Sequence, residues 1–288
     1  ATLVVDWMRV GFVHGVLNTD NMSTLGLTID YGPYGWLESF DPAWTPNTTD
    51  AATRRYRYGT QPQVAQWNLL QLANALVTLT EDPEPLQAGL EHFADHYHTL
   101  FATMMAERLG WGAPMEGDSD LVGRLFEVLT STEVDQVLFF RELASVPVTQ
   151  GSDQVEFDPS TGDVGPTDDE LLEPLHEAFY APEELTGDVR SAFVTWLRTW
   201  GTRVRGGGLD DEARRRRMEE LNPRFVLRNY LAQEAIDAVA ADDPTLLHEL
   251  HDVLRRPYDE QPGKERFAAR RPEWARHRVG CSMLSCSS

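Results

Sequence analysis

Lysine is nearly absent from this chain of 288 residues. Lys264 is the only lysine, and it lies in a stretch that contains proline and glycine near the C-terminal end. A P-loop or a protein-kinase nucleotide site places a lysine on the nucleotide phosphates. Lys264 is a poor candidate for that role, so the residues do not predict a complete nucleotide site of either kind.

Cysteine is almost as rare. Cys281 and Cys286 both fall within the last eight residues. They cannot build a disulfide framework, and such scarcity is typical of a reducing compartment. One C-x4-C pair is also a weak zinc signal, because a tetrahedral zinc site needs four ligands. The first residues lack the basic flank and long apolar core of a signal peptide. For a bacterial chain the expected location is the cytoplasm, with N-terminal targeting left open.

Positive charge is also scarce. The chain has 46 acidic and 25 basic residues, for a net charge of −21. Nucleic acids and anionic membranes bind through a positive footprint, so neither is expected as a partner. No apolar run approaches the ~20 residues that a membrane-spanning helix needs. The hydrophobic content of 41% is ordinary for a globular protein with a real core.

Helical patterns dominate after residue 60. Apolar residues recur at near-helical spacing from Pro62 onward, with the proline in the first turn. A long helix is expected over 84–108, ending at Gly110. Further helices are expected near 118–131, 133–143, 168–180, 188–201, 209–220, 224–240 and 243–255. Asp243 is the predicted N-cap of the last one.

The first 60 residues have a different hydrophobic pattern. Two short apolar runs, Val10–Val13 and Leu25–Ile29, predict strand-like segments on either side of a loop rich in Asn and Asp. The predicted fold is therefore mainly α (α+β overall). Residues 1–60 would carry the loop, and residues 61–288 would form the helical remainder.

Three polar residues of this loop region suit metal-dependent transfer of a phosphate-containing group. Asp20 and Asn21 are adjacent, and Asp30 follows ten residues later in an Asp-Tyr-Gly turn. A hard cation prefers oxygen ligands, and a hydroxyl nucleophile needs a carboxylate to accept its proton. Protein kinases use a catalytic-loop Asp and Asn, then an Asp-Phe-Gly aspartate on Mg²⁺. Either string alone is typical of an ordinary turn. Together, in this order, they favour a site.

Other functions stay open at this point. A phosphotransferase for small molecules would use the same residue types, and so would a non-catalytic module that binds a nucleotide or a partner protein. His92 and His96 share one face of a predicted helix, a spacing that can bind zinc. No further ligand accompanies them in the sequence, which favours ordinary surface or half-buried histidines.

Several longer motifs resemble one family. The first two are Trp7–Ser23, which contains His14-Gly-Val-Leu-Asn-Thr-Asp-Asn, and Gly26–Gly35. The others are Asn47-Thr-Thr-Asp50, Arg55-Tyr56, Gln61-Pro62, Trp67-Asn68, Asn222–Ala232, Arg256–Pro262 and Cys286-Ser-Ser288. Together these segments resemble the selenoprotein O family (SelO, also YdiU) of kinase-like pseudokinases. The resemblance runs from the first residues to the last.

This resemblance implies a protein-kinase-like C-terminal lobe with a helical C-terminal extension. It also implies protein adenylylation, the transfer of AMP from ATP to Ser, Thr or Tyr hydroxyls of proteins, with Mg²⁺ (or Mn²⁺) as cofactor. Asp20 would accept the proton, Asn21 and Asp30 would hold the metal, and Asp30 would also lie at the nucleotide phosphates. The alternative is a non-catalytic pseudokinase module that binds a nucleotide or a partner.

The chain departs from the family pattern in two places. The family's glycine-rich segment, phosphate-binding lysine and glutamate partner lie upstream of the first motif, and none is present here. We therefore expect a C-terminal part of a longer protein that is weakly active or inactive alone. Pro46 stands where many bacterial relatives carry a cysteine that can pair with the C-terminal cysteine. That bridge cannot form here, and a redox role for Cys281 and Cys286 stays open.

Overall fold

A computed structural model of the chain describes residues 1–80, 82–148, 166–207, 210–278 and 281. Helices dominate these residues, and their only sheet pairs two short strands, β1 (Phe12–Val13) and β2 (Gly35–Trp36). The prediction of a mainly α-helical fold is confirmed. The kinase-like arrangement and the division at residue 60 stay predictions. Within the described residues, no helix is both long and apolar enough to cross a membrane.

The chain begins with a helix that the sequence patterns did not predict. Helix α1 (Thr2–Val10) buries Val4, Trp7 and Met8 among other residues, and it ends where Gly11 takes the left-handed conformation with φ 75°. Strand β1 follows directly and pairs antiparallel with β2. Only the last two residues of the predicted Val10–Val13 strand are therefore extended.

The strand predicted at Leu25–Ile29 is wrong. Its only ladder contact is a single bridge between Met22 and Thr28. Leu25 and Leu27 are 81% and 57% exposed, so the apolar run does not pack into the core. A short apolar run becomes a strand only when a second strand lies beside it. Here the neighbouring strand β1 is paired with β2 instead.

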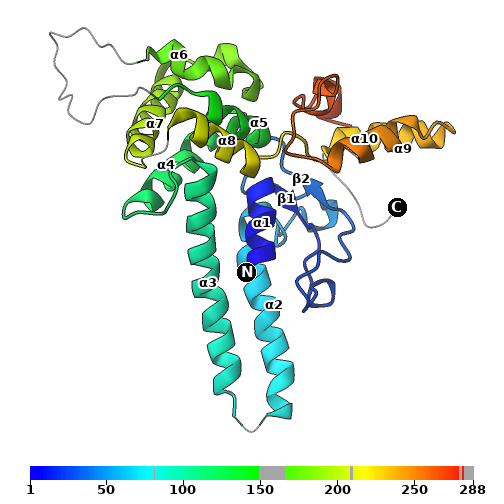
Figure 1. Cartoon of the computed structure of the whole chain (residues 1–288). Coiled ribbons are helices and arrows are strands. Elements are labelled where there is room, and N and C mark those ends of the chain that lie inside the picture. Colours follow the sequence, from blue (N-terminus) through cyan, green and yellow to red (C-terminus); the bar gives the residue numbers. More distant parts are fainter. Residues whose placement is uncertain (81, 149–165, 208–209, 279–280, 282–288) are drawn as a thin grey trace.

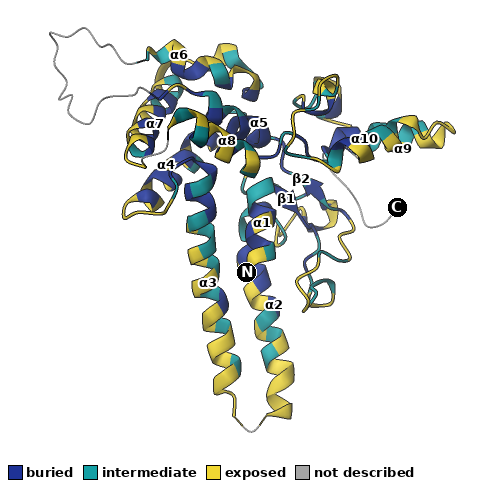
Figure 2. Ribbon diagram, viewed as in Figure 1, coloured by how far each residue is buried: buried dark blue, intermediate teal, exposed yellow. Residues whose placement is uncertain are grey.

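Two long helices project from the body of the molecule as an antiparallel hairpin (Figure 1). They are α2 (Gln61–Leu76) and α3 (Glu84–Arg108), and the bounds of α3 are those predicted. The ends next to the connecting turn are mostly exposed, whereas the base is buried (Figure 2). The hairpin base thus packs against the elements that carry the Asn/Asp-rich loop, with Val64, Ala65 and Phe93 in one cluster with Trp7 and Phe12.

The remaining helices fall into two groups: all but the last two enclose the main core, which contains Phe139, Phe193, Trp196 and Trp200, and the last two pack in a separate cluster with Phe225 and Phe267. They are α4 (Asp118–Thr130), α5 (Gln136–Glu142), α6 (Asp168–Leu172), α7 (Gly187–Arg205), α8 (Asp211–Leu221), α9 (Asn229–Ala240) and α10 (Thr245–Leu254).

Several of the predicted helices differ at their ends, and α7, for example, continues four residues past its predicted end to Arg205. The one expected over 168–180 stays α-helical only to Leu172 and continues as a 3₁₀ helix (Glu173–Ala178), with Pro174 in its first turn. The helix expected from 224 begins at Asn229, because Arg228 is still extended. At α10, Pro244 holds the N-cap position. The Asp243 carboxylate nevertheless accepts the Thr245 N–H at 3.0 Å.

A buried ion pair ties the C-terminal half to the core. Arg228 Nη1 lies 2.6 Å from Asp135 Oδ2, and both side chains are at most 1% exposed. Asp135 is also the N-cap of α5, since its Oδ1 accepts the Leu138 N–H at 3.1 Å. The next residue, Asn229, bonds both the N–H and the C=O of Trp36, each at 3.1 Å. Residues 228 and 229 therefore hold both α5 and strand β2.

Asp135→Asn should destabilise the protein by about 3 kcal/mol or more, because it leaves the Arg228 charge buried without a partner. Asparagine keeps the shape and can still cap α5, so the loss would report on the charge. Asp259→Asn, in an exposed pair with Arg256, is the control and should change stability by less than about 0.5 kcal/mol. Urea unfolding measures both. Equal effects would contradict the role of the pair.

Glu38 lies beside this pair, and the pKa of its carboxyl group is raised. It is 5% exposed, and burial raises its pKa from 4.5 to about 7, although Arg228 and Arg271 oppose the shift. Among the described residues, Glu38 Oε1 has no hydrogen-bond partner, while Oε2 lies 3.5 Å from Arg271. The carboxyl is thus easier to protonate in the folded chain than in the unfolded one.

Between pH 4.5 and about 7 the folded protein should therefore bind more protons at Glu38 than the unfolded protein does. The contribution of Glu38 to stability should fall as the pH rises through this window. Glu38→Gln removes that contribution. The stability of the wild type relative to the variant should decrease from pH 5 to pH 8, as followed by urea unfolding at several pH values. A constant difference, or one that grows with pH, would refute this assignment.

Candidate active site

The candidate site is the loop that leaves β1, together with the turn that leads into β2. It contains no regular helix longer than the 3₁₀ turn Thr19–Asn21. Gly15 starts the loop with φ 78°, and a Cβ atom there would lie 2.2 Å from the carbonyl oxygen of Pro33. Glycine is needed at this position both for its backbone angle and for the close approach of the two chain segments.

Side-chain amides hold the backbone of this loop. Gln61, buried in the first turn of α2, accepts the N–H of His14 and donates to the carbonyl of Phe12, both at 2.9 Å. Asn68, two turns further along α2, donates to the carbonyls of Leu17 and Asn18. Each buried amide pairs with peptide groups that lack a partner in a helix or sheet. The loop is therefore fixed to α2.

A second anchor comes from the segment after β2. Asn47 is buried, and its Nδ2 donates to the carbonyl of Gly15 at 3.1 Å. Asp50 accepts the N–H groups of Arg55 and Tyr56 at 2.9 and 2.7 Å. That turn positions the Tyr56 hydroxyl to donate to the Asn18 side chain. Asn47 therefore holds the loop directly, and Asp50 holds it through Tyr56.

His14 joins the two halves of the site. Its Nε2 lies 2.8 Å from the carbonyl oxygen of Ile29, the residue before Asp30. Burial lowers the pKa of His14, although that hydrogen bond, the Asn21 backbone and the negative charge of Asp30 oppose the shift. The ring is neutral near pH 7 and donates from Nε2. The structure thus brings Asn21 and Asp30 to the surroundings of one imidazole.

The three predicted site residues have free oxygen atoms. Asn21 donates from Nδ2 to the Val16 carbonyl at 2.8 Å, which leaves its Oδ1 available. Asp20 and Asp30 are exposed, and neither carboxylate pairs with another residue that the structure describes. Asp30 takes φ 49°, a left-handed angle that aspartate tolerates better than most residues. Their roles as base and metal ligands stay predictions.

The donor set fits a hard cation only with help from a substrate. Among the described residues, no group of three or more His, Cys, Asp or Glu side chains could hold a metal ion by itself. Mg²⁺ is commonly bound by one or two carboxylates, water and substrate phosphates, not by an all-protein cage. The oxygens of Asn21 and Asp30 suit that mode. His92 and His96 stack on each other, without further ligands among the described residues.

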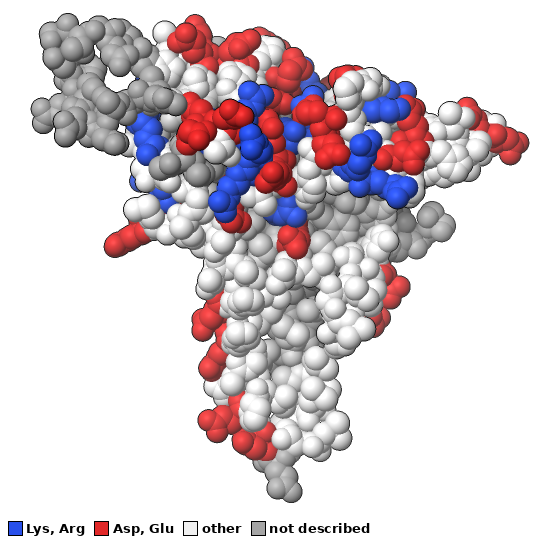
Figure 3. Space-filling model, viewed as in Figure 1, with Lys and Arg blue, Asp and Glu red and all other residues white. Residues whose placement is uncertain are grey.

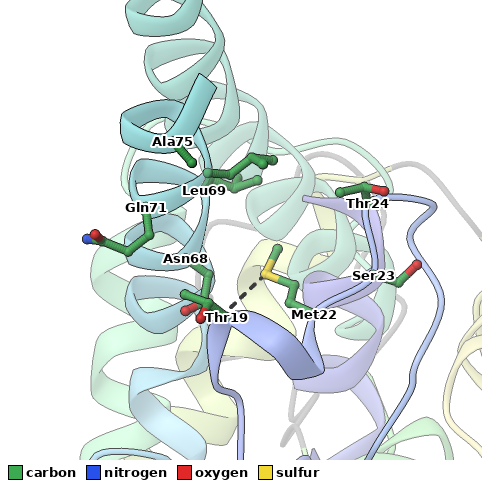
Figure 4. A pocket seen from close by; sticks show the side chains of 9 residues that line it. Thr19, Met22, Ser23, Thr24, Asn68, Leu69, Gln71 and Ala75 are labelled. Carbon is green, nitrogen blue, oxygen red and sulfur yellow. Dashed lines mark hydrogen bonds between the residues drawn. The ribbon is translucent and has the colours of Figure 1, made fainter. Parts of the chain in front are cut away.

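A cavity of about 290 Å³ adjoins Thr19, the neighbour of Asp20 (Figure 4). The loop residues Met22, Ser23 and Thr24 form one wall, and α2 forms the other with Asn68, Leu69, Leu72 and Ala75 among its residues. Figure 4 shows Asn68 bonded to the Met22 sulfur, at 3.6 Å, with Thr19 beside them. The cavity carries no charged side chain in its described lining.

Basic side chains gather elsewhere on the face shown in Figure 3, over the upper helices and C-terminal segments. The hairpin shows mainly uncharged surface there, with acidic residues toward its tip. Lys264 pairs with Glu249 of α10 at 2.7 Å, which agrees with its rejection as a phosphate-binding lysine. Cys281 is buried, and Cys286 lies outside the described residues.

Sequence patterns did not assign a role to the residues that anchor the loop. Asn47, Gln61 and Asn68 belong to motifs that carried the family resemblance, but nothing local reveals their contacts with residues 12–18. The useful signal would have been polarity at buried helical positions, since Gln61 and Asn68 are 1% and 5% exposed. A buried amide requires a hydrogen-bond partner.

Comparisons with known proteins agree with the motifs. The family model described as protein adenylyltransferase SelO matches residues 1–255. A protein nucleotidyltransferase YdiU from Rhodopirellula baltica is 53% identical over 292 residues, covering 100% of this chain and 52% of the relative. Proteins of the same name from Aromatoleum aromaticum and Flavobacterium johnsoniae are 51% and 48% identical, with 51% and 52% of each relative covered. The chain spans about half the length of these curated relatives.

Gly15→Ala tests whether the loop needs its close contact with Pro33. Gly26→Ala is a matched control, because Gly26 has φ 70° but a Cβ there would meet no described atom within 4 Å. In both variants the free energy of unfolding should fall by about 1–2 kcal/mol, because alanine is strained in the left-handed backbone conformation. Gly15→Ala should lose a further ~1–3 kcal/mol, because Pro33 must move. Chemical denaturation measures the difference, and equal losses would contradict the close packing.

Proposed function

This chain belongs to the protein adenylyltransferase SelO family, and we propose that the whole protein transfers AMP from ATP to hydroxyl groups of protein substrates. The relatives are named protein nucleotidyltransferases, which supports nucleotidyl transfer as the class of reaction. The observation that carries the proposal is that two free carboxylates, Asp20 and Asp30, lie in a loop and turn whose backbone is held by buried side-chain amides. Fixed groups cost no reorganisation when the reaction occurs.

Asp20 is the proposed general base. Its carboxylate would accept the proton of a Ser, Thr or Tyr hydroxyl as the oxygen attacks the α-phosphorus of ATP. The new bond joins the hydroxyl oxygen to that phosphorus, the bond between the α-phosphorus and the bridging oxygen breaks, and pyrophosphate leaves. Exposure of Asp20 at the loop surface leaves room for a protein substrate to approach.

Asn21 and Asp30 are the proposed ligands of Mg²⁺ or Mn²⁺. A divalent cation bound there would neutralise charge on the nucleotide phosphates. His14 would keep the two ligands in register, because it bonds the residue before Asp30 and lies against the backbone of Asn21. In this role the neutral imidazole positions the ligands and does not itself touch the substrate.

ATP binding would also need cations that reach the phosphates. The single lysine is committed to Glu249, and the chain spans about half the length of its relatives. We therefore propose the activity for the whole protein, and we expect residues 1–288 alone to transfer AMP weakly or not at all.

The sharpest test uses the full-length protein with ATP labelled at either the α- or the γ-phosphate. Label from the α position should arrive on protein, while label from the γ position should leave with pyrophosphate. If only the γ label reached the protein, the reaction would be phosphorylation, and the proposal of adenylylation would be refuted. Nucleotide binding without transfer of either label would favour a non-catalytic pseudokinase module.

Two variants should separate the proposed roles. Asp20→Asn should lower the transfer rate by about 10²–10⁴-fold while nucleotide binding persists. Asp30→Asn should abolish the nucleotide binding that depends on a divalent cation, as measured by calorimetry with and without Mg²⁺. Asp252→Asn, exposed on α10, is the control and should change neither. Metal-dependent binding that survives in Asp30→Asn would refute the ligand assignment.

A further inference from the structure

A second cavity, of about 260 Å³, lies at the hairpin base, enclosed by parts of α1, α2, α3 and α4, the turn before α2 and the segment that contains Phe40 and Pro42. Five aromatic rings line it, together with methionine side chains from α1 and α3. The rings are those of Phe40, Tyr58, Tyr97, Phe101 and Phe126. It is separate from the cavity beside Thr19, and the two share no lining residue among those described.

The described lining of this apolar space contains one charged side chain. Arg108, at the C-terminal end of α3, is only 3% exposed. Its Nε donates to Asn222 Oδ1 at 2.8 Å, and its guanidinium carbon lies 3.4 Å from the centre of the Phe140 ring. Among the described residues, no carboxylate pairs with Arg108, and its two terminal nitrogens donate no hydrogen bond.

The other buried arginines of the described chain are different. Arg228 pairs with Asp135, Arg141 with Glu260 and Arg214 with Asp211. Burying a charge without a partner is costly, and such groups are normally paired. Burial accordingly lowers the pKa of Arg108 to about 9; the positive charge of Arg9 contributes to this shift, and Tyr58 and Tyr258 oppose it. An anion placed against the free edge of the guanidinium would remove this cost.

We propose that this cavity binds a small monocarboxylate whose apolar body, a ring or a short alkyl chain, lies among the aromatic walls. A cavity of about 150 Å³ already accepts a benzene ring, and drug-sized ligands need roughly 300–1,000 Å³. The space therefore suits one ring with a short acid group. The planar guanidinium matches a carboxylate with two parallel hydrogen bonds. No second basic residue lies in the described lining, which favours a singly charged head.

The test measures thermal unfolding and calorimetric binding of the full-length protein with benzoate, phenylacetate and hexanoate as probes. Each acid should raise the melting temperature in a saturable way. Benzamide and hexanamide have nearly the same shape without the charge, and they should bind at least tenfold more weakly. Equal binding of acids and amides, or no binding by any acid, would overturn the proposal.

Two variants complete the test. Arg108→Met keeps an unbranched apolar side chain, and it should weaken acid binding at least tenfold while the amides are unaffected. Phe126→Trp keeps the arginine but fills space from a half-buried position, and it should weaken acids and amides alike. If Arg108→Met does not fold, acid binding to Phe126→Trp alone tests the site. Acid binding unchanged in the filled variant would place the acids elsewhere and refute this site.

Discussion

The backbone of residues 12–18 depends on side chains for its hydrogen bonds, and the site depends on that backbone. Beyond the short pairing of β1 with β2, the peptide groups here are met by the amides of Gln61, Asn68 and Asn47. A loop held this way has a single conformation without belonging to a helix or a sheet. Asp20 and Asn21 follow directly, so their positions are set by residues 26 or more positions away in sequence.

The same principle extends to the C-terminal half. Asn229 bonds both peptide groups of Trp36, and the adjacent Arg228 is anchored by Asp135. Strand β2 therefore has β1 on one side and a side-chain amide from α9 on the other. The turn that carries Asp30 lies between β1 and β2, so helices distant in sequence limit the movement of both halves of the site. The hydrogen bonds of these buried side chains serve here to select one arrangement.

Local sequence patterns predicted features that depend on neighbouring residues, such as helix bounds. They missed contacts between residues that are far apart in sequence. Helix α3 is long and has a glycine just beyond its end, so its bounds were predictable. Helix α1 is short, and its start gave no capping signal. Leu25–Ile29 has strand-like composition, but composition cannot supply a neighbouring strand. The amides of Gln61 and Asn68 act across about 50 positions, a pairing that no periodicity reports. Arg108 is basic in a helix end, where sequence alone would place it in solvent.

The close approach of Gly15 to Pro33 has a genetic consequence. Every amino acid other than glycine would place a Cβ atom within 2.2 Å of a backbone oxygen that itself belongs to the Asp30 turn. Any change of this codon that is not silent should therefore destabilise the loop. One codon thus constrains how closely the loop that carries Asp20 approaches the turn that carries Asp30, although it encodes neither acid.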